Sequence, residues 1–103
     1  MSERRQVRVA PAFFHRLDRF LPPERTGRGL LSSADFLLHE IPPIIERLAT
    51  DFERATTAVP GAAGVRMLIT AGVLVPYIVV YVTVAVDGAV ELVELEADLG
   101  AAE

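Results

Sequence analysis

VRMLITAGVLVPYIVVYVTVAVDGAVELVEL, residues 65–95, is the stretch that decides the fold. It is dominated by β-branched and aromatic residues, which lose side-chain freedom in a helix but fit a pleated sheet. Ala71-Gly72, followed by Pro76, interrupts the stretch once. Asp87-Gly88 interrupts it again with a dipeptide typical of two-residue hairpin turns. The pattern predicts a β-meander of three antiparallel strands, near Val65–Thr70, Tyr77–Val86 and Ala89–Leu95.

A membrane-spanning helix is the competing interpretation of the same stretch. Residues 67–86 carry no charge, and these 20 residues have the length that such a helix needs. Against this interpretation, Pro76 lies in the middle of the run, and the residues after Asp87-Gly88 alternate between apolar and acidic. A membrane helix would leave that alternating strand without a partner. We therefore favour the meander, and a single-pass membrane protein remains the weaker alternative.

The composition fits one small domain. The chain has 103 residues, of which 51% are hydrophobic, and this is enough for a single core. The absence of cysteine excludes disulfides and thiol chemistry, and it fits a reducing compartment. No N-terminal signal peptide is visible. We expect a cytoplasmic protein that forms one domain over residues 1–103.

Charge is unevenly distributed along the chain. Residues 1–30 hold seven arginines and three acids, whereas six acids and no basic residue follow Arg66. A basic face near the N-terminus could meet nucleic acid or an acidic partner. Arginines that solvate the outer faces of the first strand and helix explain the same distribution, and we favour this simpler explanation.

One strand and two to three helices are predicted upstream of the meander. Gln6–Ala10 alternates and predicts a short strand, and Pro11 suits the first turn of a helix over Ala12–Leu21. A basic connecting loop around Thr26–Gly29 follows. The first strand is expected to pair with the meander, parallel to one of its strands.

The next helix begins with a capping-box pattern, Ser32 with Asp35. Pro42-Pro43 breaks or kinks it, and a further helix is expected at Ile44–Thr56. The predicted fold class is therefore α+β: an N-terminal strand, two to three helices, then a three-stranded antiparallel β-meander packed under the helices.

Motifs that carry chemistry are scarce. Neither His15 nor His39 has a second ligand at suitable spacing, and there is no nucleophile motif or glycine-rich nucleotide fingerprint. We expect no metal and no cofactor. Glu91, Glu94 and Glu96 could form an acidic stripe, but Glu91 and Glu94 share a face only if a bulge separates them. A solvated strand edge is the favoured interpretation.

Three further side chains of the meander are candidates for binding. Arg66 is the only charged residue between Arg54 and Asp87. Such a lone cation commonly keeps a sheet margin soluble, and it could also anchor a phosphate or a carboxylate. Tyr77 and Tyr81 share strand parity, so their hydroxyls could lie on one face. Packing in a core or an interface is the favoured role for both.

Over nearly its full length, the chain resembles the RelE/ParE superfamily of type II toxins. The resemblance rests on VRVAPAFFHRLDRFL at residues 7–21, on the two helical segments, and on VRMLIT, YIVVYVTV, DG and AVELVEL near the end. Members of that family have a strand, helices and then a twisted antiparallel meander. A basic residue opens the first meander strand, and a Val-Val-Tyr motif precedes the hairpin. Here these positions are Arg66 and Val79-Val80-Tyr81.

The chain departs from the family's RNA-cleaving members, which share a cluster of basic side chains on the meander. Arg66 fills the first of these positions, but Leu68 and Ile78 fall on the next two, and residues 91–103 contain no base. Phosphodiester cleavage needs preorganised cations to stabilise the developing charge. Whether the chain is an enzyme therefore stays open, and we lean toward a protein that is not one.

The resemblance implies the toxin component of a type II toxin–antitoxin system, of the kind linked to plasmid stabilisation. Such a toxin binds a macromolecular target, either gyrase, as in the ParE branch, or the ribosome and its mRNA, and a cognate antitoxin neutralises it. The alternative is a non-catalytic interaction domain or a homodimerisation domain with the same fold. The candidates for target binding are Arg66, Arg8, Arg16 and Tyr81. Those for the partner interface are Phe13, Phe14, Tyr77 and Val79.

Overall fold

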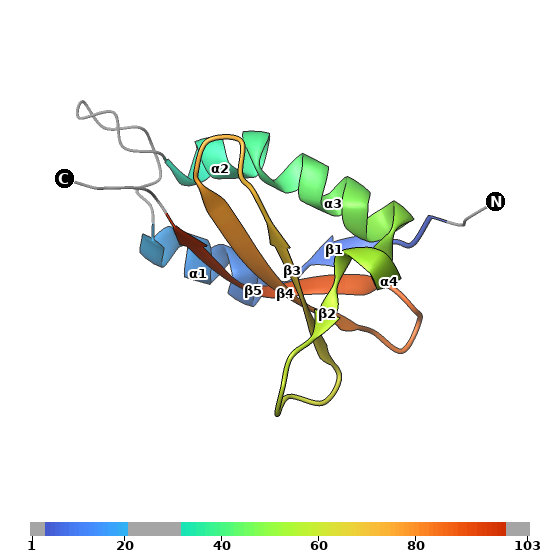
Figure 1. Cartoon of the computed structure of the whole chain (residues 1–103). Coiled ribbons are helices and arrows are strands. Elements are labelled where there is room, and N and C mark those ends of the chain that lie inside the picture. Colours follow the sequence, from blue (N-terminus) through green and yellow to red (C-terminus); the bar gives the residue numbers. More distant parts are fainter. Residues whose placement is uncertain (1–3, 21–31, 99–103) are drawn as a thin grey trace.

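The computed structural model describes residues 4–20 and 32–98, so the loop predicted around Thr26–Gly29 lies outside the described residues. Figure 1 shows α2 and α3 following one another along one side of a twisted sheet, with α1 next to β5. The elements in chain order are β1 (Val7–Val9), α1 (Pro11–Phe20), α2 (Ser33–His39), α3 (Ile41–Thr50), α4 (Phe52–Ala55), β2 (Thr57–Ala58), β3 (Val65–Thr70), β4 (Tyr77–Val84) and β5 (Val90–Asp98).

The uncharged stretch folds as sheet. Antiparallel pairing joins β3 to β4 and β4 to β5, which is the predicted meander, and β1 pairs in parallel with β5, Val7 opposite Val90. Residues 67–86 thus form strands and their connections, which contradicts the membrane-helix alternative. None of the helices in residues 4–20 and 32–98 has the length and apolar character to cross a membrane.

The α+β class is confirmed, although the sheet has one strand more than predicted. Its order is β1-β5-β4-β3-β2, and the extra strand, β2, pairs antiparallel with the start of β3. No element was predicted at these two residues, which directly follow the helix expected at Ile44–Thr56. Its sequence, Thr57-Ala58, is too short to show a pattern, and pairing with Arg66 and Met67 alone makes it a strand.

The turn between β4 and β5 differs in detail from the prediction. The amide of Ala85 donates to the carbonyl oxygen of Ala89, and the amide of Gly88 donates to that of Ala85, so three residues, 86–88, form the loop. Gly88 has φ +89°, whereas no described residue other than glycine has positive φ. A two-residue type I′ turn would need positive φ at Asp87 as well. The predicted two-residue turn is therefore wrong.

The helices begin and end where local signals place them, with one exception. Ser32 and Asp35 form the predicted capping box. The chain breaks at Glu40, and Pro42-Pro43 falls in the first turn of α3, where missing amides cost little. The helix predicted over Ile44–Thr56 instead begins at Ile41 and is interrupted at Asp51, where φ is −146°.

The core lies between the helices and one face of the sheet. The inward side chains of β4, namely Ile78, Val80 and Val82, have no exposed surface. They pack in one cluster with residues of α1, α2 and α3, among them Phe13 and Phe36. Side chains alternate along each strand, so every second one points to the opposite face of the sheet. On β3, one of these is Ile69, which is 57% exposed.

Candidate functional site

The sheet face opposite the helices, called the open face below, is built from three rows of side chains that cross the strands. In each row, a residue of β3 lies opposite a residue of β4, which lies opposite an acid of β5. The rows are Ile69–Val79–Glu96, Met67–Tyr81–Glu94 and Val65–Thr83–Glu91. The β3 and β4 members of the first two rows are apolar or aromatic, so the open face has an apolar side and an acidic side.

A β-bulge in β5 brings the acids together. Tyr81 pairs with Glu94 and the next residue, Val82, pairs with Leu92, so Val93 is the extra residue of the bulge. The bulge restores parity between Glu91 and Glu94 and puts both on the open face. The acidic stripe considered from sequence therefore forms. β1 pairs with residues 90–92 only, so Glu91 lies on an inner part of β5, whereas Glu94 and Glu96 lie beyond this pairing, where the favoured interpretation as a solvated strand edge still holds.

Tyr81 lies between the apolar side and the acidic side of the open face. Burial raises the pKa of its hydroxyl, and the carboxylates of Glu96 and Glu94 raise this pKa further. Tyr77 lies on the same face, as strand parity predicted, and is 46% exposed. The phenol of Tyr81 therefore stays protonated at neutral pH and can donate a hydrogen bond to the acidic side.

Two of the candidate arginines border the acidic side, and both are in ion pairs. Arg8 donates two hydrogen bonds to Asp87, at 2.9 and 3.3 Å, and two to Glu91, at 3.1 and 3.2 Å. These bonds raise the pKa of Arg8, the bond to Asp87 most of all, and Arg8 in turn lowers the pKa of Asp87. Arg16 Nε lies 3.0 Å from Glu94 Oε1. Both guanidinium groups are thus engaged by carboxylates of the chain itself.

Arg66 points to the helix side of the sheet. Its Nε donates to the hydroxyl of Thr56 at 2.6 Å, and its Nη2 donates to the Thr56 carbonyl oxygen at 2.8 Å. The guanidinium lies 5.7 Å from the ring centroid of Phe52. Arg66 therefore ties the end of α4 to β3. It does not join Arg8 and Arg16 in one cluster, and a role in target binding stays a prediction.

The residues at the other two basic positions, Leu68 and Ile78, are fully buried in the core. Of the interface candidates, Phe13 is also fully buried, so its side chain is not part of the surface and that prediction is corrected. The apolar stripe of α1 turns Phe13 into the core and leaves the next residue, Phe14, 41% exposed. Val79 lies on the open face but is only 8% exposed.

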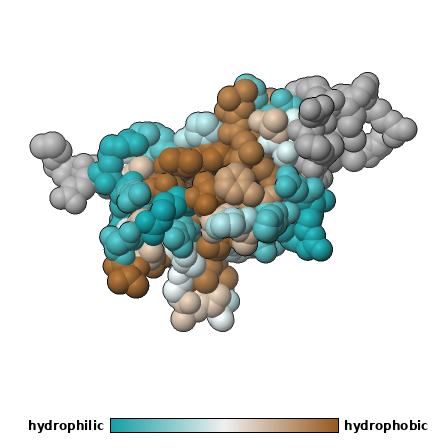
Figure 2. Space-filling view, turned by 180° about the vertical axis from the view of Figure 1, so that it is seen from behind, coloured by the Kyte–Doolittle hydropathy of each residue, from teal (hydrophilic) through white to brown (hydrophobic). Residues whose placement is uncertain are grey.

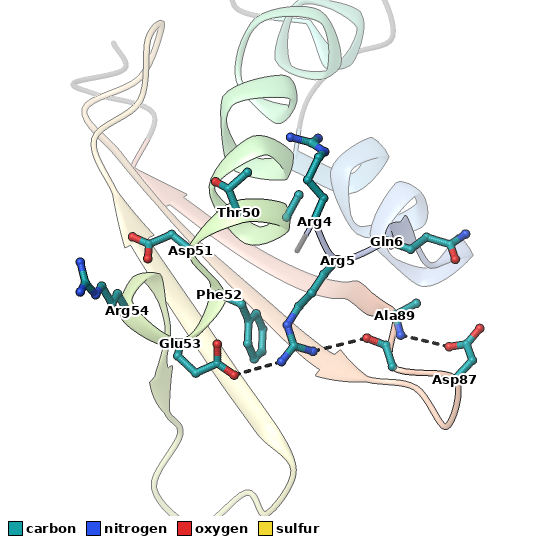
Figure 3. Close-up of a pocket in the computed structure, with 12 residues that line it drawn as sticks. Arg4, Arg5, Gln6, Thr50, Asp51, Phe52, Glu53, Arg54, Asp87 and Ala89 are labelled. Atoms are coloured by element: carbon teal, nitrogen blue, oxygen red, sulfur yellow. Dashed lines mark hydrogen bonds and ion pairs between the residues drawn. The ribbon is translucent and has the colours of Figure 1, made fainter. Parts of the chain in front are cut away.

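A hollow of about 920 Å³ lies beside the N-terminal segment, α4 and the β4–β5 turn. Figure 3 shows Arg5 crossing it, with the Phe52 ring beside the guanidinium, whereas Arg4 and Arg54 point away. Arg5 lies 4.7 Å from the ring centroid and donates to Glu53 at 3.0 Å and to the Gly88 carbonyl oxygen at 3.4 Å. These contacts join the N-terminal segment to α4 and the turn. The role of Arg5 in this hollow is therefore to hold the fold together.

Glu40, which is 2% exposed, was not among the residues predicted from the sequence. Its carboxylate accepts hydrogen bonds from the amides of Val73, at 2.7 Å, of Leu74, and of Val75, at 3.1 Å. A Cβ on Gly72 would lie 2.5 Å from the Val75 carbonyl oxygen, so glycine is needed for this loop to close around the carboxylate. The one sign of this role in the sequence is the position of the acid, directly at the helix break before Pro42-Pro43.

In the described part of the chain, no three His, Asp or Glu side chains come together as a metal site. Comparisons with protein-family models, with curated proteins and with solved structures found no match. The candidate functional site is the open face, because its apolar side leaves Ile69 and Tyr77 exposed next to a stripe of acids.

Proposed function

We propose that the chain is the toxin component of a type II toxin–antitoxin system, a cytoplasmic protein that binds a macromolecular target and is neutralised by an antitoxin. The resemblance of its sequence to the RelE/ParE superfamily is the starting point. The observation that supports the proposal most is the exposure of apolar side chains on the open face. Within the described residues, Ile69 is 57% and Tyr77 46% exposed, and a stripe of acids lies beside them. Exposed apolar surface of this kind marks sites where other macromolecules bind.

The charges of the open face favour a protein target over RNA. Cleavage of a phosphodiester needs cations aimed at the scissile phosphate. Arg8 and Arg16 are both bound by carboxylates, and Arg66 is bound by Thr56 on the other side of the sheet. The proposal is therefore a non-enzymatic toxin that inhibits a protein such as gyrase, in the manner of the ParE branch.

The test is inducible expression of the chain alone and together with the reading frame next to its gene. We expect growth to stop when the chain is expressed alone and to recover when the neighbouring frame is co-expressed. Plasmid supercoiling should change before protein synthesis falls. A nonsense codon at Leu68 is the control, because it keeps the transcript and removes the meander. Unaffected growth, translation and DNA topology at high expression would remove the proposal.

The exposed apolar residues of the open face also favour an alternative, a homodimerisation domain that uses this face. Light scattering after size exclusion separates the two functions. A monomer across the accessible concentration range excludes the alternative. A dimer that is dissociated by a charge at Val79, and also by Ile69→Asp at an exposed residue of the same face, supports it.

A further inference from the structure

We infer that the open face binds a partner segment that is both apolar and basic, with its apolar side chains over β3 and β4 and its lysines or arginines over β5. The inference names the chemistry of the protein that the proposed toxin meets, and in that respect it rests on the proposed function. It is carried by the arrangement of two kinds of side chain on this face.

The first step is geometric. Met67 and Ile69 of β3 and Tyr77 and Tyr81 of β4 lie on the open face and form an apolar lane. Neighbouring strands are about 4.8 Å apart, so the acids of β5 form a second lane directly beside it. Figure 2 shows the back of the molecule, where apolar groups gather across the middle and hydrophilic groups lie around them. A partner that covers one lane therefore reaches the other.

The second step is the charge of the acidic lane. Among the described side chains, its side of the face holds four carboxylates, which are Asp87, Glu91, Glu94 and Glu96, and two guanidinium groups, which are Arg8 and Arg16. These six groups carry a net charge of minus two. Arg8 is shared between Asp87 and Glu91, and within the described residues the partner of Glu96 is the hydroxyl of Tyr81 and not a cation. A partner can supply the missing positive charge.

The charge of the acidic lane favours a basic partner segment over two other occupants. Nucleic acid has the same sign of charge as the acidic lane and would be repelled by it. A second copy of the chain, docked about a two-fold axis, brings the same acids on its own β5, so it can cover the apolar lane but cannot neutralise the acidic lane. A basic amphipathic segment matches both lanes at once, and a helix laid along the strands is one form of it.

The experiment measures the anisotropy of a labelled amphipathic helical peptide that has a leucine stripe with lysines along one border. The control peptide has glutamates in place of the lysines. We expect the lysine peptide to bind the full chain at least about tenfold more tightly than the glutamate peptide, with affinity that falls as salt rises. Equal binding of both peptides, or binding of neither, would overturn the inference.

Two double variants locate the site. Glu94→Gln with Glu96→Gln should weaken lysine-peptide binding about tenfold, because both charges of the acidic lane opposite Tyr81 and Val79 are lost. The control variant, Glu46→Gln with Glu53→Gln, removes two exposed acids of α3 and α4 and should leave the affinity for the lysine peptide unchanged. Equal loss in the two variants contradicts the inference. Harmless expression in cells would remove the toxin function but leave these results standing, so the two failures are distinguishable.

Discussion

At the scale of single residues, Glu40 shows how one buried carboxylate organises two distant parts of the chain. It lies between α2 and α3 and accepts three amide hydrogens from the β3–β4 loop. Hydrogen bonds to a charged acceptor are stronger than those between neutral groups. The carboxylate therefore stabilises both the break between the helices and the loop that connects the strands.

Replacing Glu40 with glutamine should destabilise the protein by about 2 kcal/mol, because the amide side chain cannot accept all three hydrogen bonds with full strength. Urea unfolding measures the free energy, and hydrogen exchange at Val73–Val75 should become faster in the variant. Glu46→Gln is the matched control on α3, where an exposed pair with Arg4 contributes little. Equal effects of the two substitutions would show that the loop does not depend on Glu40.

Asp87 should make stability depend on pH. Its pKa is lowered, first by Arg8 and then by the amide of Ala89, so the folded chain binds this proton less readily than the unfolded chain. Its contribution is present above the usual pKa of about 4 and is lost as the pH falls through the lower folded value. Wild type should therefore be more stable than Asp87→Asn at pH 6, with the difference in urea midpoint shrinking toward pH 3. A difference that stays constant with pH contradicts this.

At the scale of elements, residues 65–95 were predictable because their signals are local. The β-branched residues and the period-two alternation predict the strands between Val65 and Leu95. The capping-box pair Ser32 and Asp35 predicts the start of α2. The parity of Tyr77 and Tyr81 placed both on one face. The bulge at Val93 decides whether the acids form a stripe. The apolar pair Leu92-Val93 interrupts the alternation in the sequence, but only the pairing with β4 shows that the interruption is a bulge.

The three-residue turn between β4 and β5 gives a prediction at the same scale. Gly88 has φ +89°, and a Cβ there would meet nothing within 4 Å, so only backbone strain opposes a side chain. Gly88→Val should cost about 1–2 kcal/mol, and Gly88→Asn should cost less, because asparagine tolerates the left-handed region. Urea unfolding of both variants measures the costs. Equal costs for asparagine and valine would contradict the turn geometry.

At the scale of the whole molecule, the contacts that sequence analysis could not provide are those between residues far apart in the chain. Arg66 looked like a free cation because its partner, Thr56, belongs to another element. The arginines near the N-terminus were expected to solvate outer faces, with a basic face as the alternative, yet the fold places Asp87, Glu91 and Glu94 against Arg8 and Arg16. Composition shows how many charges there are, and only the sheet order shows which of them neutralise each other.

The same long-range order explains why the open face is the surface to test. All the helices pack their apolar side chains toward one side of the sheet, which within the described residues leaves Ile69 of β3 and Tyr77 of β4 exposed on the other side. The central claim is therefore that this face does the binding on which function depends.

Growth arrest by two matched variants tests this claim most directly. Ile69→Asp puts a charge in the apolar lane, and Val86→Asp puts the same charge on a fully exposed residue of the β4–β5 turn. Circular dichroism first shows whether both variants are folded. If they are, we predict that Val86→Asp stops growth as wild type does and that Ile69→Asp does not. If Ile69→Asp stopped growth as well as wild type, the open face would not be the surface on which function depends.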